Sequence, residues 1–299
     1  MRRYRTVDVF TDRAFGGNPL AVVLDAEGLS TAQMQAVARE FDYAETTFVL
    51  PPGDPCHRAR VRIFTPGSEI PFAGHPNIGT AFVLAHEDGD VCETLTFEED
   101  AGLVSIRLLR DGGAFVGAEL TAPQALQVFA RVAASDAAAC VGLTSGDVTT
   151  GPQQPCVASV GLPFLFVELT GLDALARARA DVGAFERLLP CHGANAIYLH
   201  VRDPQERELR HARMFSPLDG IGEDPATGSA AAALVALLTC SERQAGIALD
   251  VAIRQGEAMG RPSLIRARAA KHGGIVDGIK VRGHCVPMFN GTFNLPGAA

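Results

Sequence analysis

The chain has no tryptophan, and only 6% of its 299 residues are aromatic. It also has no cluster of one charge, because 26 Lys and Arg are interspersed with 34 Asp and Glu, for a formal net charge of −8. Nucleic-acid partners need clustered basic residues, so we expect none. The longest purely apolar run, residues 230–238, is about half of what a membrane span needs. Without an apolar leader segment, we expect a cytoplasmic protein with no membrane partner.

Signs of metal, disulfide and nucleotide chemistry are missing as well. The seven cysteines include no C-x-x-C pair and the eight histidines no H-x-x-x-H pair, which favours free thiols and argues against zinc. The glycines at 222 and 228 are one residue too far apart for a phosphate loop, and no lysine precedes Ser229. No G-x-G-x-x-G follows a predicted strand. We therefore expect neither a metal nor another cofactor.

An internal repeat is present instead. Arg62–Pro66 (RIFTP) recurs roughly 150 residues later as Arg213–Pro217 (RMFSP), and Pro71–His75 (PFAGH) recurs as Pro225–Ser229 (PATGS). A looser match, Tyr43–Glu45 with residues 193–195, precedes both at a similar offset. Ordered matches at a nearly constant offset indicate two copies of one unit.

Each copy has the same predicted layout of strands, a Gly/Pro loop and a central helix. Residues 230–238 have no polar face, so this helix should be buried inside a curved sheet. We expect an α+β fold of two pseudo-symmetric halves, each a barrel-like sheet wrapped around its helix. The N-terminal half is predicted as 1–125, completed by about 284–299, and the C-terminal half as 126–283, with the active site in the cleft between them. The expected helices are 31–41, 77–86, 173–180, 182–189 and 230–239, and the expected strands are 4–10, 20–24, 46–50, 59–64, 94–97, 104–109, 164–169, 196–201, 211–215, 275–282 and 291–295.

The loops that open the two central helices resemble each other. Gly74 and Gly228 allow tight turns and a close approach to a ligand. A helix start offers unpaired N–H groups and the positive end of the helix dipole, which suit a carboxylate. The glycines of a single loop could equally serve a tight turn only. Because the loop is duplicated, we favour a substrate-binding role for both glycines.

Polar residues near these loops are the candidates for chemistry. Glu45 precedes an apolar strand, where partial desolvation would raise its pKa and make it a better proton carrier, although an exposed charge is the simpler interpretation. His75 and Ser229 occupy matching positions at the helix starts, where Ser229 could be only a cap. Asp224 and Asn18 could be only turn residues. Residues 259–263 indicate a further turn before a strand, with no role that the chemistry suggests.

Taken together, these segments resemble the phenazine-biosynthesis isomerase (PhzF-like) family, within the diaminopimelate epimerase-like superfamily. The segments that carry the resemblance are Phe15–Pro19 (FGGNP), Ala44–Thr46 (AET), Pro71–Pro76 (PFAGHP), Glu223–Ser229 (EDPATGS) and Met259–Ser263 (MGRPS).

The resemblance implies that Glu45 is the acid/base and that His75, Asp224 and Ser229 form the surrounding proton-handling network. Gly74 and Gly228 would offer backbone amides, and Asn18 would help to bind substrate. It further implies a small carboxylate substrate, a homodimer, and an activity like that of trans-2,3-dihydro-3-hydroxyanthranilate isomerase, which moves a proton between two ring carbons.

One departure from the pattern of the related epimerases limits which activities are possible. In the related epimerases two cysteines precede the helix-start glycines and act as opposed bases, whereas this chain has Ala73 and Thr227. A two-thiol epimerase is thus excluded. A single carboxylate can move a proton along one face of a flat substrate, which favours an isomerase. The alternatives are an epimerase or racemase with Asp224 or His75 as the second base, and a non-catalytic small-molecule binding protein.

Overall fold

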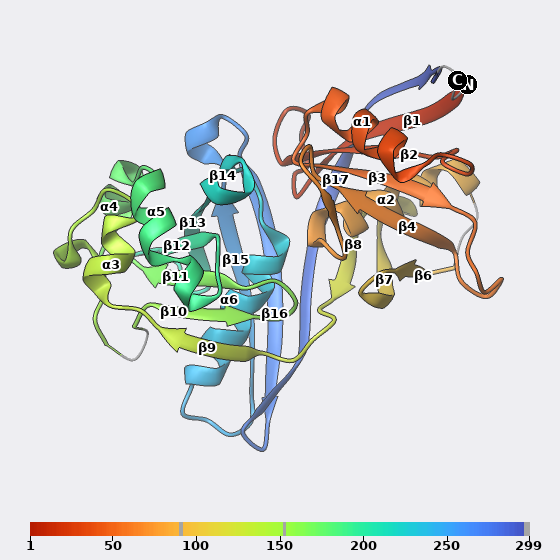
Figure 1. Ribbon diagram of the computed structural model, residues 1–299. Coiled ribbons are helices and arrows are strands. Elements are labelled where there is room, and N and C mark those ends of the chain that lie inside the picture. The colour runs from red at the N-terminus through yellow and green to blue at the C-terminus, as the bar shows by residue number, and fades with distance from the viewer. Residues whose placement is uncertain (90–91, 152–153, 296–299) are drawn as a thin grey trace. The chain divides into compact units, whose positions relative to one another are not determined.

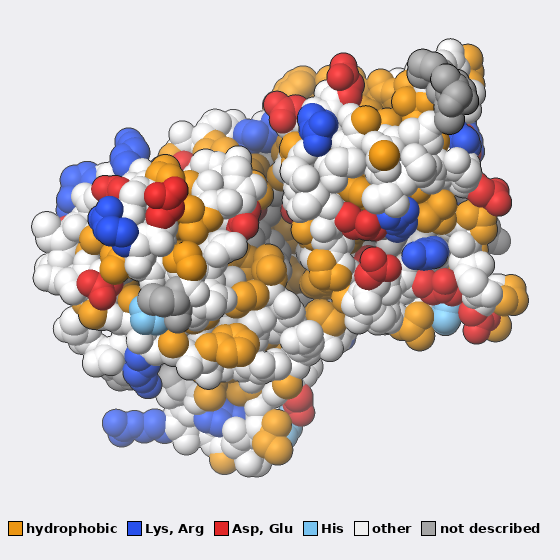
Figure 2. Space-filling model, in the orientation of Figure 1, with side chains coloured by type: hydrophobic (Ala, Val, Ile, Leu, Met, Phe, Trp, Pro, Cys, Tyr) orange, Lys and Arg blue, Asp and Glu red, His pale blue; other side chains and the backbone are white. Residues whose placement is uncertain are grey.

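The computed structural model describes residues 1–89, 92–151 and 154–295 (Figure 1). The chain folds into two compact units: unit 1 contains residues 1–121 and 282–299, and unit 2 contains residues 122–281. No helix in the described ranges is both long and apolar enough to cross a membrane. On the face shown in Figure 2, acidic and basic side chains are scattered among apolar and uncharged ones.

Unit 1 is a closed barrel around one helix. The strands pair in the circuit β1-β2-β3-β4-β6-β7-β8-β17 and back to β1, and the pairs β2–β3 and β4–β6 are parallel. Helix α2 contacts β1, β2, β3, β7 and β8. The elements are β1 (Arg2–Val9), β2 (Asn18–Val23), α1 (Thr31–Phe41), β3 (Glu45–Leu50), β4 (Ala59–Phe64), β5 (Glu69–Ile70), α2 (Gly74–Asp88), β6 (Thr94–Glu99), β7 (Gly102–Asp111) and β8 (Ala114–Thr121), together with the later part of β17 (Ile275–Phe293).

Unit 2 repeats the central part of this circuit. Parallel β11–β12, antiparallel β12–β13, parallel β13–β15 and antiparallel β15–β16 correspond to β2–β3, β3–β4, β4–β6 and β6–β7. Helix α6 packs on β10, β15 and β16. The elements are β9 (Gln127–Arg131), α3 (Ala134–Ala139), η1 (Ser145–Asp147), β10 (Cys156–Ser159), β11 (Phe164–Glu168), α4 (Leu172–Arg177), α5 (Val182–Leu188), η2 (Pro190–His192), β12 (Ile197–Arg202), β13 (Leu209–Ser216), η3 (Pro217–Asp219), β14 (Ile221–Asp224), α6 (Gly228–Ser241), β15 (Ile247–Gln255), η4 (Glu257–Met259) and β16 (Ser263–His272).

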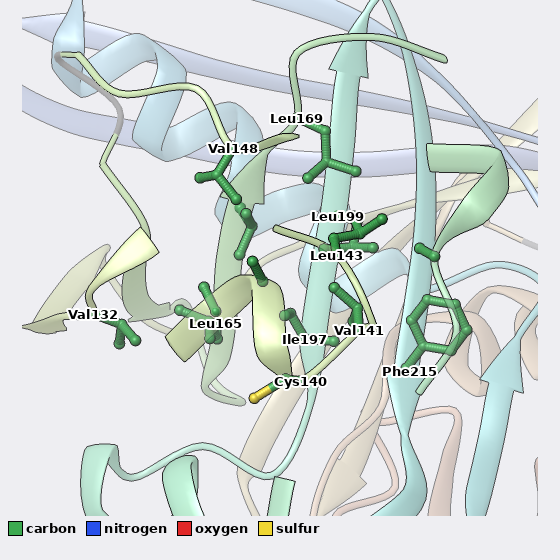
Figure 3. Packing of buried hydrophobic residues seen from close by; sticks show 14 of the residues in the cluster. Val132, Cys140, Val141, Leu143, Val148, Leu165, Leu169, Ile197, Leu199 and Phe215 are labelled. Carbon is green, nitrogen blue, oxygen red and sulfur yellow. The ribbon is translucent and has the colours of Figure 1, made fainter. Parts of the chain in front are cut away.

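The duplicated R-x-F motif forms the same contacts in both units. The guanidinium group of Arg62 lies 5.2 Å from the ring centroid of Phe64 and pairs with Glu69. That of Arg213 lies 4.8 Å from the ring of Phe215 and pairs with Glu223. Phe215 packs into an apolar cluster of unit 2 that includes Val141, Ile197 and Leu199 (Figure 3). The predicted α+β fold of two similar halves is confirmed.

Two groups of predicted boundaries were wrong. Helices α2 and α6 begin at Gly74 and Gly228, not at 77 and 230, because proline and glycine are tolerated in a first helical turn. The predicted strand 275–282 and residues 291–293 of the predicted strand 291–295 belong to one strand, β17. Pro287 pairs with Val7 beside a register shift in β1, and such an irregularity is where a sheet tolerates proline.

Close packing fixes α2 inside its barrel. A Cβ added to Gly79 would lie 2.6 Å from Leu20 Cδ2 and 2.8 Å from Val9 Cγ2, so only glycine lets the helix approach β1 and β2 this closely. Buried residues fill the helix through Ala85, with Ile78 and Ala81 fully inaccessible. The first turn of α2, which carries the candidate site residues, is therefore held by a rigid core.

Candidate functional site

In unit 1, three of the predicted residues lie together. Glu45 is the first residue of β3, His75 is the second residue of α2, and Asn18 is the first residue of β2. The Nε2 atom of His75 lies 3.3 Å from Oε2 of Glu45, and its Nδ1 atom lies 3.4 Å from Nδ2 of Asn18. Because β2 and β3 pair in parallel, Asn18 and Glu45 lie at the same end of the barrel.

The Glu45 side chain is only 13% exposed, so the simple interpretation of an exposed charge at a strand entrance is wrong. Asn18 is fully buried, and the turn before it is made by Gly17, at φ +63, where an added Cβ would lie 2.3 Å from the Val9 carbonyl oxygen. Asn18 therefore has a side-chain role that its turn motif did not indicate.

Burial controls the charge of His75. Desolvation lowers the pKa of His75 to about 3, so the ring is neutral at physiological pH. If the Asn18 amide nitrogen donates to Nδ1, the single ring proton is on Nε2, facing Glu45. A neutral imidazole with so acidic a conjugate acid is a poor base but a good hydrogen-bond donor, which suits a residue that orients Glu45 or stabilises developing negative charge.

Unit 2 has a second group of predicted residues at the start of α6. Gly228 and Ser229 are the first two residues of α6, matching Gly74 and His75 in α2. Asp224, the last residue of β14, is 6% exposed, and its Oδ2 atom accepts a hydrogen bond of 2.5 Å from Thr227 Oγ1. The N-cap of α6 is Thr227 and not Ser229, and no side chain caps either α6 or α2. The first amides of both helices are thus not occupied by a capping side chain.

Gln255 was missed by the sequence analysis. It is the last residue of β15, is 1% exposed, and its amide bonds to Asp224, Thr227 and Tyr198. A lone glutamine at the end of a strand gives no signal of such a role.

The segment 259–263, for which the sequence suggested no role, has a structural one. Gly256 has φ +75, and an added Cβ would lie 2.4 Å from the Arg261 carbonyl oxygen and 2.6 Å from that of Pro225. The Arg261 amide donates to the Gly256 carbonyl oxygen, closing a turn over η4. This turn packs against Pro225 and so holds Gln255 beside the loop that opens α6.

Among the residues that the structure describes, no group of three or more His, Cys, Asp or Glu is arranged to hold a metal ion. The polar groups at both helix starts are instead hydrogen-bond donors and a few carboxylates, which can bind an anion and carry a proton.

The buried ionisable groups predict how stability depends on pH. His75 and His200 each have a pKa lowered to about 3 by burial, so below pH 6.5 only the unfolded chain gains these protons and stability falls. Burial raises the pKa of Glu99 to about 8, so above its ordinary value stability falls as pH rises. Below pH 6.5 the two histidines together outweigh Glu99, and above pH 6.5 the effect of Glu99 prevails, with Glu168, whose pKa burial also raises, acting in the same direction. The free energy of unfolding should therefore be highest near pH 6.5 and should fall on each side by less than about 1.4 kcal/mol per pH unit, because the opposing groups titrate over the same range.

Urea unfolding at a series of pH values measures this curve. Glu99→Gln should reduce the decline between pH 6.5 and 8 and steepen the rise below it, whereas His200→Gln should flatten the rise. A wild-type curve that is level from pH 5.5 to 8 in the same buffers would show that these groups are not held in the charge states given above.

Comparisons with known proteins show the family of the chain. Residues 7–291 match the model of the family described as phenazine biosynthesis-like protein (PhzC-PhzF). An uncharacterized isomerase of Mesorhizobium japonicum is 39% identical over 97% of this chain and 98% of its own length. The trans-2,3-dihydro-3-hydroxyanthranilate isomerase of Pseudomonas aeruginosa is 37% identical over 95% of this chain and 96% of its own length. A phenazine biosynthesis protein of the PhzF family from Bacillus anthracis has a similar structure, with a TM-score of 0.86 and 25% identity over 98% and 99% of the two chains.

The fold and the names of the relatives support an isomerase or epimerase built from two similar units. The chain belongs to the phenazine biosynthesis-like (PhzC-PhzF) family, and the predicted resemblance is confirmed. The prediction that it is an isomerase is confirmed as well, since relatives similar over nearly their whole length bear that name.

Proposed function

We propose that the protein moves a proton between two carbons of a small cyclic carboxylate, in a reaction like that of trans-2,3-dihydro-3-hydroxyanthranilate isomerase, with Glu45 as the acid/base. The observation that carries this proposal is the pair formed by Glu45 and the neutral His75, 3.3 Å apart at the mouth of a rigid barrel. A largely buried carboxylate beside a neutral donor can accept a proton and return it.

The absence of thiols at the helix starts supports an isomerase over a two-base epimerase. Ala73 cannot act as a base, and the Thr227 hydroxyl is already donated to Asp224. His75, with a pKa of about 3, is too weak a base to serve as the second one at neutral pH. Asp224 is then the remaining candidate for a second base, and we propose that it instead orients substrate or assists proton transfer.

Substrate labelled with deuterium at the donor carbon tests this function. The product of wild-type turnover should be the isomer with the proton on a different ring carbon, and a shielded single base should return part of the label. Two results contradict the proposal: inversion of a stereocentre without migration, which indicates an epimerase, and saturable binding without turnover, which indicates a binding protein.

We propose that the first amides of α2, near Gly74, and those of α6, near Gly228, each form an anion site that can bind a substrate carboxylate. Because no side chain caps α2 or α6, their first N–H groups are suited to an anion. Gly228→Val would place a branched side chain over the start of α6 and should weaken the binding of anthranilate, used as a simple aromatic carboxylate, about tenfold, or about 1.4 kcal/mol. Isothermal titration calorimetry measures this affinity.

Gly246→Val is the matched control, because an added Cβ there meets no atom within 4 Å and its φ does not require glycine. This variant should bind anthranilate as wild type does. A folded Gly228→Val protein with unchanged affinity would place the carboxylate elsewhere.

A further inference from the structure

The amide of Gln255 has all four of its hydrogen-bonding positions occupied. Its Nε2 atom donates to the Asp224 carbonyl oxygen (2.8 Å) and to Thr227 Oγ1 (2.9 Å). Its Oε1 atom accepts from Tyr198 Oη (3.1 Å) and from the Thr227 amide (3.3 Å). The orientation of the amide is fixed, because a backbone carbonyl can only accept and a backbone N–H can only donate.

This orientation determines the direction of the next hydrogen bond. Because Thr227 Oγ1 accepts from Gln255, its own proton is directed to the nearest acceptor, Oδ2 of Asp224, at 2.5 Å. The whole chain of contacts is buried, with Gln255 at 1%, Asp224 at 6% and Thr227 at 7% exposure. Buried hydrogen bonds of this kind are directional and strengthen one another.

We propose that Gln255 is a positioning residue that, through the Thr227 hydroxyl, holds Oδ2 of Asp224 as a hydrogen-bond acceptor and so fixes the orientation of the carboxylate that assists proton transfer. The catalytic part of this proposal rests on the proposed function, in which Asp224 assists proton transfer. The geometric part does not, since it concerns only the direction of three buried hydrogen bonds.

The same contacts position the start of α6. The Thr227 amide precedes the first turn of the helix, and Gln255 both accepts from it and donates to the Asp224 carbonyl oxygen. Gln255 therefore fixes the backbone on either side of Pro225 and Ala226, and Gly256, the next residue, packs closely against Pro225. Asp224 and the amides of α6 are thereby held as one unit.

The test that needs no substrate is the titration of Asp224 by carboxyl NMR in the full-length protein. Gln255→Met keeps the size of the side chain but removes its polar atoms, and Thr227→Val removes the hydroxyl. In Thr227→Val the carboxylate of Asp224 loses this hydrogen bond, so its titration midpoint should rise by about one pH unit. In Gln255→Met the Thr227 hydroxyl remains but is no longer oriented, so the midpoint should rise by a smaller amount. Thr227→Ser, which keeps the hydroxyl, should restore the wild-type midpoint.

The double variant tests whether the two residues act as one chain. If Gln255 acts through Thr227, Gln255→Met combined with Thr227→Val should shift the midpoint no further than Thr227→Val alone. Tyr198→Phe is the control for a merely structural effect: it removes one contact of Gln255 but leaves the hydrogen bonds from Gln255 to Thr227 and from Thr227 to Asp224, so it should lower stability and move the midpoint less than Thr227→Val does.

Kinetics then connect this positioning to turnover. With the proposed substrate, Gln255→Met should lower kcat about tenfold or more, change KM less, and move the acidic limb of the kcat profile to higher pH together with the NMR midpoint. A midpoint unchanged in folded Gln255→Met and Thr227→Val overturns the proposal. A shifted midpoint in a protein whose wild type does not turn over the substrate supports the positioning and refutes only the proposed function.

Discussion

Replacing Glu45 by glutamine is expected to leave substrate binding nearly unchanged and to lower kcat by about 10²–10⁴-fold, the usual value of general acid–base catalysis. Glutamine has the size and shape of glutamate and can still face His75 Nε2, but it cannot accept a proton. Since Glu45 is proposed to carry both transfers, the loss should reach the upper part of that range. Steady-state kinetics and a binding titration with anthranilate separate kcat from affinity.

Glu40→Gln is the matched control, because Glu40 is an exposed residue near the end of α1, and it should leave kcat and KM unchanged. Glu45→Asp keeps the acid but shortens its reach, and its kcat should lie between the two. Near-native turnover by a folded Glu45→Gln protein would remove Glu45 from the mechanism and make Asp224 the leading candidate for the base.

His75→Ala should cost less than Glu45→Gln in this scheme. The ring is neutral and its Nε2 atom lies 3.3 Å from Glu45, so its proposed part is to orient Glu45 or the substrate and not to carry the transferred proton. The two residues differ because their surroundings differ: His75 lies in the enclosed first turn of α2, where a positive charge is strongly disfavoured, whereas Glu45 keeps 13% of its side-chain surface exposed.

A feature of the site could be predicted from the sequence when the residues that form it are neighbours in the chain. Asp224 lies just before the start of α6, and His75 lies in the first turn of α2. Both positions follow from residues adjacent in sequence, so the duplicated loop was enough to predict them. The meeting of Asn18, Glu45 and His75 depends on the parallel pairing of β2 with β3 and was available only through the family resemblance. Gln255 lies 28 residues after Thr227 in the chain, and nothing in its own neighbourhood indicated the contact.

The bounds of helices and strands were likewise predicted correctly where local sequence determines them and wrongly where tertiary pairing does. The strand 59–64 and the helix 31–41 were predicted with the bounds that the structure has, since clear alternation defines the first and a capping box at Ser30 and Gln33 the second. Strand β17 was split in the prediction because Gly283 and Pro287 are strand breakers by themselves. Tertiary pairing with β1 overrides that local preference over nearly the whole later part of the strand.

The duplicated arginines allow a paired prediction on stability. Arg213→Ala should lower the free energy of unfolding by about 3–5 kcal/mol, the usual cost of leaving one partner of a buried ion pair uncompensated. Arg213 is 8% exposed; it donates from Nε and Nη2 to both oxygens of Glu223, and from Nη1 to the carbonyl oxygens of Leu175 and Ala178. Without Arg213, Glu223 would lose its ion-pair partner, and the carbonyl oxygens of Leu175 and Ala178 would lose a hydrogen-bond donor. Urea unfolding at pH 6.5 gives the change.

Arg62→Ala is the control supplied by the repeat itself. Arg62 makes the same bidentate contact with Glu69, but its side chain is 16% exposed. Its further contact is to the exposed hydroxyl of Thr31. Arg62→Ala should therefore lower the free energy of unfolding by only about 1 kcal/mol. Replacing Arg213 and Glu223 together by methionine should recover much of the stability lost in Arg213→Ala, because no buried charge then remains. If the two alanine variants lose equal stability, burial does not distinguish the two copies of the motif, and the difference between the units lies elsewhere.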